Sequence, residues 1–245
     1  MYKRQSNRYI ASLPWYDSDA KREALNQFWR TVAQSLADAG VEGVQSELTR
    51  DQPFAALWQS PNLILSQCCG PDLFTPDGAD LCVLARPVFA ELDCQPGCYY
   101  SHIVARTEFS STQARIVVNS LSSRSGYSAL MEWMNSHAIE ASAVHISGSH
   151  SNSLTMLEDG LADLAAIDAH TVNQQGIKLS LPVIDRSSES LAPPYVYNRN
   201  SAFNRDLLFQ ALADAVNIEG ETIGISDVLR SDNDCYRKKF RSGSS

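Results

Sequence analysis

The sequence predicts an α/β protein, and two neighbouring stretches carry this prediction. In each, a short apolar run rich in β-branched residues precedes a serine-rich loop and then a helical pattern. The first stretch covers residues 115–134 and the second covers residues 143–160. A third apolar run, residues 162–168, ends in Asp168. Ligands bind open parallel sheets beyond the carboxyl ends of the strands, so this edge is the expected site.

The first serine-rich loop suits an oxyanion. It runs from Asn119 to Gly126, between a strand over 116–118 and a helix that begins at Tyr127. Such a loop points several N–H groups and hydroxyls at one spot, and the helix dipole adds partial positive charge there. An ordinary helix cap with extra serines is the alternative, because Ser and Asn are the usual cap residues.

The second serine-rich loop repeats this arrangement. Residues 147–153 follow a strand expected over 143–146, and a short helix over 154–160 ends at Gly160. The repetition favours an anion site over an ordinary cap.

Length and charge limit the classes of function. The chain has 245 residues, enough for one large or two small α/β domains, and 44% of them are hydrophobic. Its net charge of −8 argues against nucleic acid, which needs a basic face. The charge does not exclude a small anion, because local N–H groups decide such sites. The sequence holds no apolar run of the roughly 18 residues that would suggest a membrane span.

The start of the chain and its cysteines are less informative. Residues 1–5 are basic but precede no apolar run, so we expect no secretory signal peptide in the printed chain. This leaves open a mature or truncated exported protein and a cytoplasmic one. The cysteines, at 68, 69, 82, 94, 98 and 235, form no metal-binding pattern, and no cofactor fingerprint or nucleophile motif is found. We therefore expect no metal, cofactor or catalytic residue. Whether Cys94 and Cys98 form a disulfide is left open.

The remaining elements are predicted from periodicity and breakers. Before the first loop we expect a strand over 8–13, a helix over 19–39 stopped by Gly40, a short strand over 44–48, a short helix over 53–59, and strands over 62–67, 80–90 and 98–106. After Asp168 we expect a short helix over 170–174, a strand over 177–184, a polar linker over 187–192, an extended segment over 193–197 and a helix over 205–216. The tail from residue 217 is weakly patterned.

Taken together, these motifs resemble the phosphonate-type, or type 2, periplasmic solute-binding proteins of ABC transporters. The matching segments cover about residues 8 to 216, and they are residues 13–17, 62–70, 100–104, 119–127, 147–153 and 160–168. Each motif is weak alone, whereas their order and spacing are fairly specific.

The resemblance implies the type 2 periplasmic-binding-protein fold, with two α/β lobes joined by a two-strand hinge. Lobe one would combine residues 8–97 with 195–245, and lobe two would be residues 98–194. The hinge strands would lie near 100–106 and 193–197, and the ligand would sit in the cleft between the lobes.

The resemblance also implies the ligand-binding residues. They are Tyr16, Ser66, Tyr100, Ser123, Arg124, Ser125, Gly126, Tyr127, Ser149, His150, Ser151 and Asp168. The two serine-rich loops would hold the oxyanion, while Tyr16 and Tyr100 would form aromatic walls. Arg124 departs from the family, which usually has small hydroxyl residues there. It would either pair with a larger or more charged anion or point to solvent.

The implied function is a non-enzymatic binder that delivers a small oxyanion, of phosphonate or phosphate type, to an ABC transporter permease. We expect such a protein to be periplasmic and monomeric. The alternatives are a cytoplasmic enzyme on the same fold and a ligand sensor that signals to a partner protein.

Overall fold

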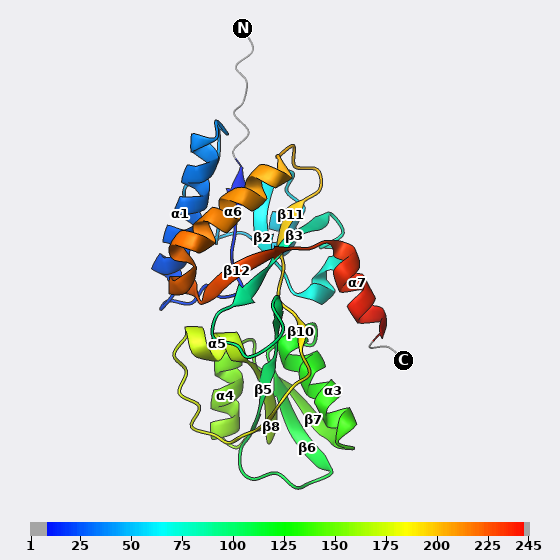
Figure 1. The fold of residues 1–245 in the computed structure, drawn as a ribbon. Helices are drawn as coiled ribbons and strands as arrows, with labels where there is room; N and C mark the ends of the chain where they lie inside the picture. The colour runs from blue at the N-terminus through cyan, green and yellow to red at the C-terminus, as the bar shows by residue number, and fades with distance from the viewer. Residues whose placement is uncertain (1–8, 243–245) are drawn as a thin grey trace. The chain divides into compact units, whose positions relative to one another are not determined.

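The computed structural model describes residues 9–242, and the side chains of residues 9–238. The basic start of the chain and residue 8 of the predicted first strand lie outside this range. The chain forms two compact units, each with its own sheet. Unit 1 combines Met1–Ala90 with Leu191–Ser245, and unit 2 is Glu91–Ser190. The chain therefore crosses between the units at 90/91 and 190/191, a few residues before the predicted boundaries (Figure 1).

Unit 1 is built on a mixed five-stranded sheet in the order β1-β2-β11-β3-β12. The strands are β1 Ile10–Ala11, β2 Leu63–Gln67, β3 Leu81–Phe89, β11 Tyr195–Asn198 and β12 Ile225–Arg230. β1 and β2 run parallel, whereas β11 and β12 pair antiparallel with their neighbours. The returning chain supplies the two strands of opposite direction.

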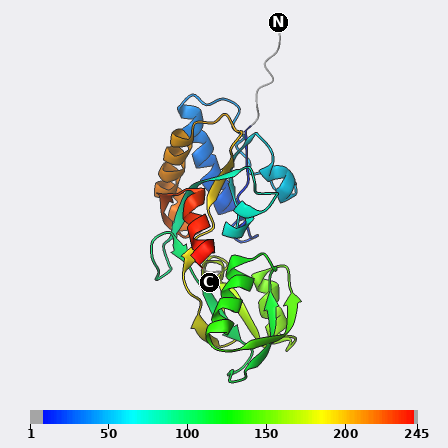
Figure 2. The same ribbon diagram turned by 90° about the vertical axis from the view of Figure 1, so that its right-hand side faces the viewer.

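Helices α1 and α6 of unit 1 lie side by side (Figures 1 and 2). The helices of this unit are α1 Arg22–Asp38, α2 Phe54–Trp58, α6 Arg205–Glu219 and α7 Asn233–Ser242. The predicted apolar face of α1 is confirmed, because its buried residues include Leu25, Phe28, Trp29, Val32 and Leu36. Gly40 adopts a left-handed φ of 82°, as expected of a helix stop.

Unit 2 contains the predicted strand–loop–helix repeats. Its sheet has the order β7-β6-β8-β5-β9, with β5 Ser101–Ala105, β6 Gln113–Val118, β7 Glu140–Ile146, β8 Leu164–Asp168 and β9 Val183–Arg186. β6 runs parallel to both β7 and β8, as predicted, whereas β5 is antiparallel to β8 and β9. The carboxyl ends of β6, β7 and β8 therefore lie at one edge of the sheet.

The core of unit 2 follows from alternation along β6. Ile116 and Val118 pack with Leu130 of helix α3, Ala129–Ser136. Val117 faces the other side and packs with Leu157 of helix α4, His150–Glu158. A strand buried on both faces explains the continuous apolar run in the sequence.

Three predicted strands differ from the structure. Residues 44–48 form no strand; Val44 makes an isolated bridge with Tyr9. The segment 177–184 is mostly irregular, because its apolar residues pack on the α4 side of the core and Pro182 lacks an N–H for a ladder. The strand predicted over 98–106 is divided at Tyr100 into β4, Cys98–Tyr99, and β5.

The predicted hinge strands and polar linker also need correction. β5 lies inside the sheet of unit 2, and β11 lies in the middle of the sheet of unit 1. Neither is a free crossing strand. Within the predicted linker, Ser190–Leu191 forms the short strand β10, which pairs with β4.

Candidate anion-binding site

The first serine-rich loop ends in a capped helix start. A π-helical turn, Arg124–Ser128, leads directly into α3. Ser123 is its N-cap: the Ser123 hydroxyl accepts a hydrogen bond of 2.9 Å from the backbone N–H of Gly126. Ser123 and Ser125 are both buried. The two roles considered for this loop therefore belong to different serines. Ser123 caps the helix, and the hydroxyl of Ser125 is left for another partner.

That partner is the second serine-rich loop. Ser125 Oγ lies 3.1 Å from Nε2 of His150, the first residue of α4. Ser149 caps α4, and its hydroxyl accepts a hydrogen bond of 3.1 Å from the N–H of Asn152. The two helix starts, which follow the adjacent parallel strands β6 and β7, thus meet through one contact.

His150 and Asp168 set the electrostatics of this edge. Burial lowers the pKa of His150, against the opposing influence of the Asp168 carboxylate and the Ala166 carbonyl. His150 is therefore neutral at pH 7. Asp168 is buried, and its Oδ1 accepts a hydrogen bond of 2.8 Å from the N–H of Thr171, which caps helix α5, Ala169–Gln174.

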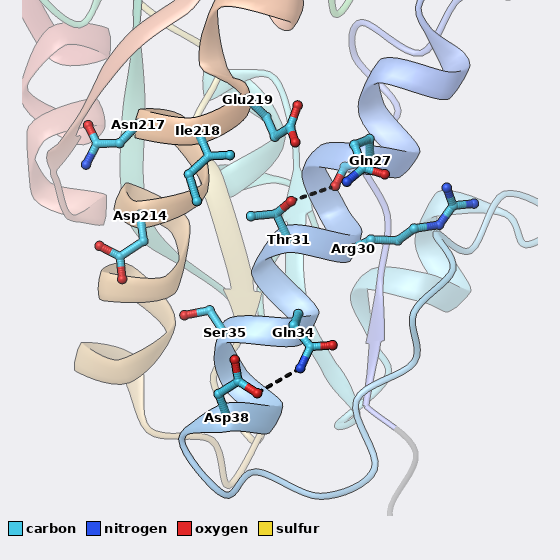
Figure 3. A pocket seen from close by; sticks show the side chains of 10 residues that line it. All are labelled: Gln27, Arg30, Thr31, Gln34, Ser35, Asp38, Asp214, Asn217, Ile218 and Glu219. Carbon is cyan, nitrogen blue, oxygen red and sulfur yellow. Dashed lines mark hydrogen bonds between the residues drawn. The ribbon is translucent and has the colours of Figure 1, made fainter.

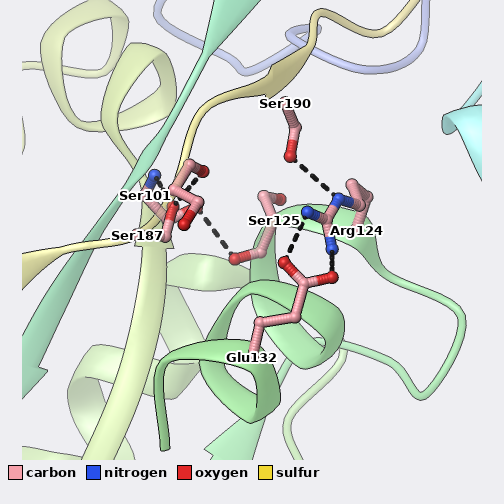
Figure 4. Close-up of polar contacts among 7 residues, drawn as sticks. Ser101, Arg124, Ser125, Glu132, Ser187 and Ser190 are labelled. Atoms are coloured by element: carbon pink, nitrogen blue, oxygen red, sulfur yellow. Dashed lines mark hydrogen bonds and ion pairs between the residues drawn. The ribbon is translucent and has the colours of Figure 1, made fainter. Parts of the chain in front are cut away.

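Arg124 does not point to solvent, and its pairing with an anion stays a prediction. Its guanidinium donates two hydrogen bonds to Glu132, at 2.6 and 2.7 Å, and Nε donates to the hydroxyl of Ser190 at 2.9 Å (Figure 4). The Arg124 side chain is 11% exposed. It is therefore directed away from solvent and is already paired with a carboxylate.

Three other predicted residues have contacts of their own. The hydroxyl of Ser151 donates to Gln175 at 3.2 Å, beside a small hollow of about 170 Å³ that α4 shares with residues 177–180. The ring of Tyr127 packs against the α3 side of the core. The ring of Tyr100 lies below the guanidinium of Arg186, 5.1 Å from its centroid. That these three residues contact an anion stays a prediction.

The two remaining predicted residues belong to unit 1. Tyr16 is buried and meets Phe89 edge to face, with the ring centroids 5.7 Å apart. Ser66 is fully buried in β2. That they complete a site with residues of unit 2 stays a prediction.

Sequence reasoning missed two residues, Ser101 and Ser187, that hold the first loop in place. The hydroxyl of Ser101 donates to the carbonyl of Ser125 at 2.9 Å. Ser101 in turn exchanges hydrogen bonds with Ser187, through its N–H at 3.0 Å and its carbonyl at 2.8 Å. Beside the turn, a Cβ added to Gly126 would lie 2.0 Å from Oδ1 of Asn119, so glycine is required by close approach. Contacts between residues this far apart leave no periodic signal in a sequence.

Other features of the described residues take no part in this site. Helices α1 and α6 border an open groove of about 890 Å³ that holds none of the predicted residues (Figure 3). Across residues 9–242 no cluster of three or more His, Cys, Asp or Glu side chains is arranged to hold a metal, and no helix could cross a membrane. Cys94 and Cys98 are not joined by a disulfide, and burial raises the pKa of the Cys94 thiol to about 11.

Solved structures of binding proteins share this fold. PhnD1 from Prochlorococcus marinus in complex with methylphosphonate superposes with a TM-score of 0.70 at 15% identity, over 96% of each chain. XAC2383 from Xanthomonas citri bound to ATP gives a TM-score of 0.67 at 10% identity, over 98% of this chain and 100% of that one. A binding protein component of an ABC phosphonate transporter from Pseudomonas aeruginosa gives 0.64 at 14% identity, over 93% and 82%.

No protein-family model and no curated protein matches the chain. The structural likeness nevertheless extends over both units, and it confirms the predicted α/β periplasmic-binding-protein fold. At these identities the likeness concerns the fold alone.

Proposed function

We propose that this chain is the solute-binding component of an ABC transporter and that it binds a small oxyanion at the two serine-rich loops of unit 2. The contact between Ser125 Oγ and His150 Nε2 carries this proposal, because it joins two capped helix starts into one cluster of donors. Helix starts attract anions through free N–H groups and the helix dipole. We further propose a transporter permease as the partner and the periplasm as the location.

A ligand of the phosphonate or phosphate type fits the chemistry of the loops. Hydroxyl and N–H groups would meet its oxygens, and neutral His150 adds one further donor or acceptor. Two of the structural neighbours support this class, one in complex with methylphosphonate and one a component of a phosphonate transporter. Asp168 would repel an oxyanion, so its role would be to meet an amine or hydroxyl of the ligand or to orient His150.

The pairing of a serine with a histidine also invites an enzymatic reading, in which His150 would activate Ser125 as a nucleophile. Such a base is normally oriented by a third group. The nearby carboxylate, Asp168, caps helix α5 instead: its Oδ1 accepts a hydrogen bond from the N–H of Thr171. A binding role for Ser125 and His150 therefore accounts for the contacts better than a catalytic one.

A thermal-shift screen tests the proposal. Wild-type protein, Ser125→Ala and the matched control Ser188→Ala, an exposed serine of unit 2, would be heated with methylphosphonate, phosphate, a sulfonate and a carboxylate. We expect at least one of these anions to stabilise the wild type and the control, and to stabilise Ser125→Ala less. Equal stabilisation of all three proteins would place the anion elsewhere. For any anion that binds, small-angle scattering should show a smaller radius of gyration on binding, as expected when a ligand contacts both lobes.

A further inference from the structure

We propose that Arg124 is a positioning residue that fastens the first serine-rich loop to the point where the chain leaves unit 2. Its charge is reserved for Glu132 and is not offered to a ligand. This inference rests on the proposed function in so far as the loop is taken to be the anion site. The fastening itself is a property of the ligand-free protein.

The geometry of the guanidinium supports a fixed role. The two outer nitrogens meet the two oxygens of Glu132 in the planar, bidentate arrangement that gives the strongest arginine–carboxylate pairs. The N–H at Nε donates to the buried hydroxyl of Ser190. Three of the five N–H donors of the group are thus engaged, and the carboxylate of Glu132 occupies the end of the fork that would pair bidentately with an anion.

Ser190 gives this contact its significance, because it is the last residue of unit 2 before the chain returns to unit 1. A second tie runs in parallel: the carbonyl of Ser125 accepts from Ser101, which is bonded in turn to Ser187 (Figure 4). Consecutive residues of the loop, Arg124 and Ser125, are therefore held to neighbouring points of the departing segment. The donors of the loop keep their positions only while these ties hold.

A positioning role and a ligand-binding role predict opposite effects of Glu132→Gln. If Arg124 attracted the anion directly, removing the competing carboxylate would strengthen binding. If Arg124 positions the loop, the same change loosens the ion pair and weakens binding. Arg124→Lys also distinguishes the two roles. Lysine keeps the positive charge, but its ammonium group cannot bind the Glu132 carboxylate bidentately and the Ser190 hydroxyl at the same time.

The test combines hydrogen exchange with calorimetry on the full chain. Glu132→Gln, Ser190→Ala and Arg124→Lys would be compared with two controls, Glu140→Gln, which removes an exposed carboxylate from β7, and Ser188→Ala. Exchange would be followed in the ligand-free proteins on a peptide that spans residues 119–131. Methylphosphonate would be the calorimetric probe.

We expect roughly tenfold faster exchange of the loop amides in all three test variants, the factor that corresponds to one lost charge-assisted hydrogen bond, and no change in the controls. Methylphosphonate affinity should fall in Glu132→Gln and Arg124→Lys. Unchanged exchange, or stronger binding by Glu132→Gln, would overturn the inference. If the wild type does not bind the probe, the proposed anion class is at fault, and the exchange measurement alone decides for or against the fastening.

Discussion

Ser125 Oγ and His150 Nε2 lie 3.1 Å apart, although 25 residues separate them in the chain. A serine hydroxyl has one proton to donate, so the tautomer of His150 decides what remains for a ligand. If Nε2–H of the neutral ring donates to Ser125, the hydroxyl proton is free for an oxyanion. The proposed donation from Ser125 to an anion therefore requires the Nε2–H tautomer of His150. Nitrogen chemical shifts of the imidazole would test this, and the Nδ1–H tautomer in the bound protein would contradict it.

The same histidine should make the stability of the free protein depend on pH. Burial lowers the pKa of both His150 and His102 from the ordinary 6.5. The unfolded chain then binds protons more readily than the folded one, so stability is complete above pH 6.5 and declines as the pH falls towards the folded-state pKa values. The urea concentration at the midpoint of unfolding should be lower at pH 5.5 than at pH 7.5. His150→Gln should flatten this decline, whereas His145→Gln on the edge strand β7 should not; equal slopes in the two variants would refute the assignment.

A structural ion pair in unit 2 offers a prediction independent of the ligand. Arg115 donates to both oxygens of Asp163, at 3.1 and 2.7 Å, and this lowers the pKa of Asp163. The stability from this pair is present above the ordinary pKa of 3.8 and is lost as the pH falls through the lower folded-state value. Asp163→Asn should reduce the free energy of unfolding at pH 7 only modestly, since the pair is partly exposed to solvent. Chemical denaturation of this variant and of a control, Asp159→Asn at an exposed position, would check this prediction. An equal loss of unfolding free energy in the two variants would contradict it.

Gly126→Ala should disturb the first loop through one neighbour. The added Cβ would lie 2.0 Å from Oδ1 of Asn119 and 3.2 Å from the hydroxyl of Ser123, so the amide must move and the cap must lengthen. We expect roughly tenfold weaker binding of an oxyanion, the cost of about one charged hydrogen bond. Asn119→Ala in the same chain removes the obstructing amide and should restore part of the affinity. A failure of the double variant to recover any binding would show that the glycine matters for another reason.

Asp168→Asn should change ligand preference more than anion affinity. Asparagine keeps an oxygen for the N–H of Thr171, so helix α5 remains capped. The loss of a negative charge should lower the preference for an amino-substituted phosphonate over methylphosphonate, which calorimetry with both compounds would measure. An unchanged ratio of the two affinities would exclude a direct contact between Asp168 and a ligand amine.

The sequence was informative where the chain repeats a local pattern. The two strand–loop–helix stretches of unit 2 and the apolar face of α1 were predictable, because burial on a fixed period leaves a visible signal. Strand β12 was missed, since its register shifts between Ile225 and Asp227 and the bulge breaks the alternation of buried residues.

The residue types of the candidate site could be predicted from the sequence, whereas the contacts between their side chains could not. Serines and a histidine at helix starts marked the two loops. The role of Arg124 was not visible, because Glu132 is eight positions away and Ser190 is 66 positions away, and neither spacing is diagnostic. Ser101 and Ser187 meet only because β5 runs beside the segment that leaves unit 2.

Calorimetric titration of Ser125→Ala and His150→Ala with an oxyanion that binds the wild type tests the central claim most directly. Each variant should bind roughly tenfold to a hundredfold more weakly, the range expected for one charged hydrogen bond. The melting temperature of each free protein should stay close to that of the wild type. Wild-type affinity in both variants would contradict the assignment of the two serine-rich loops as the anion site.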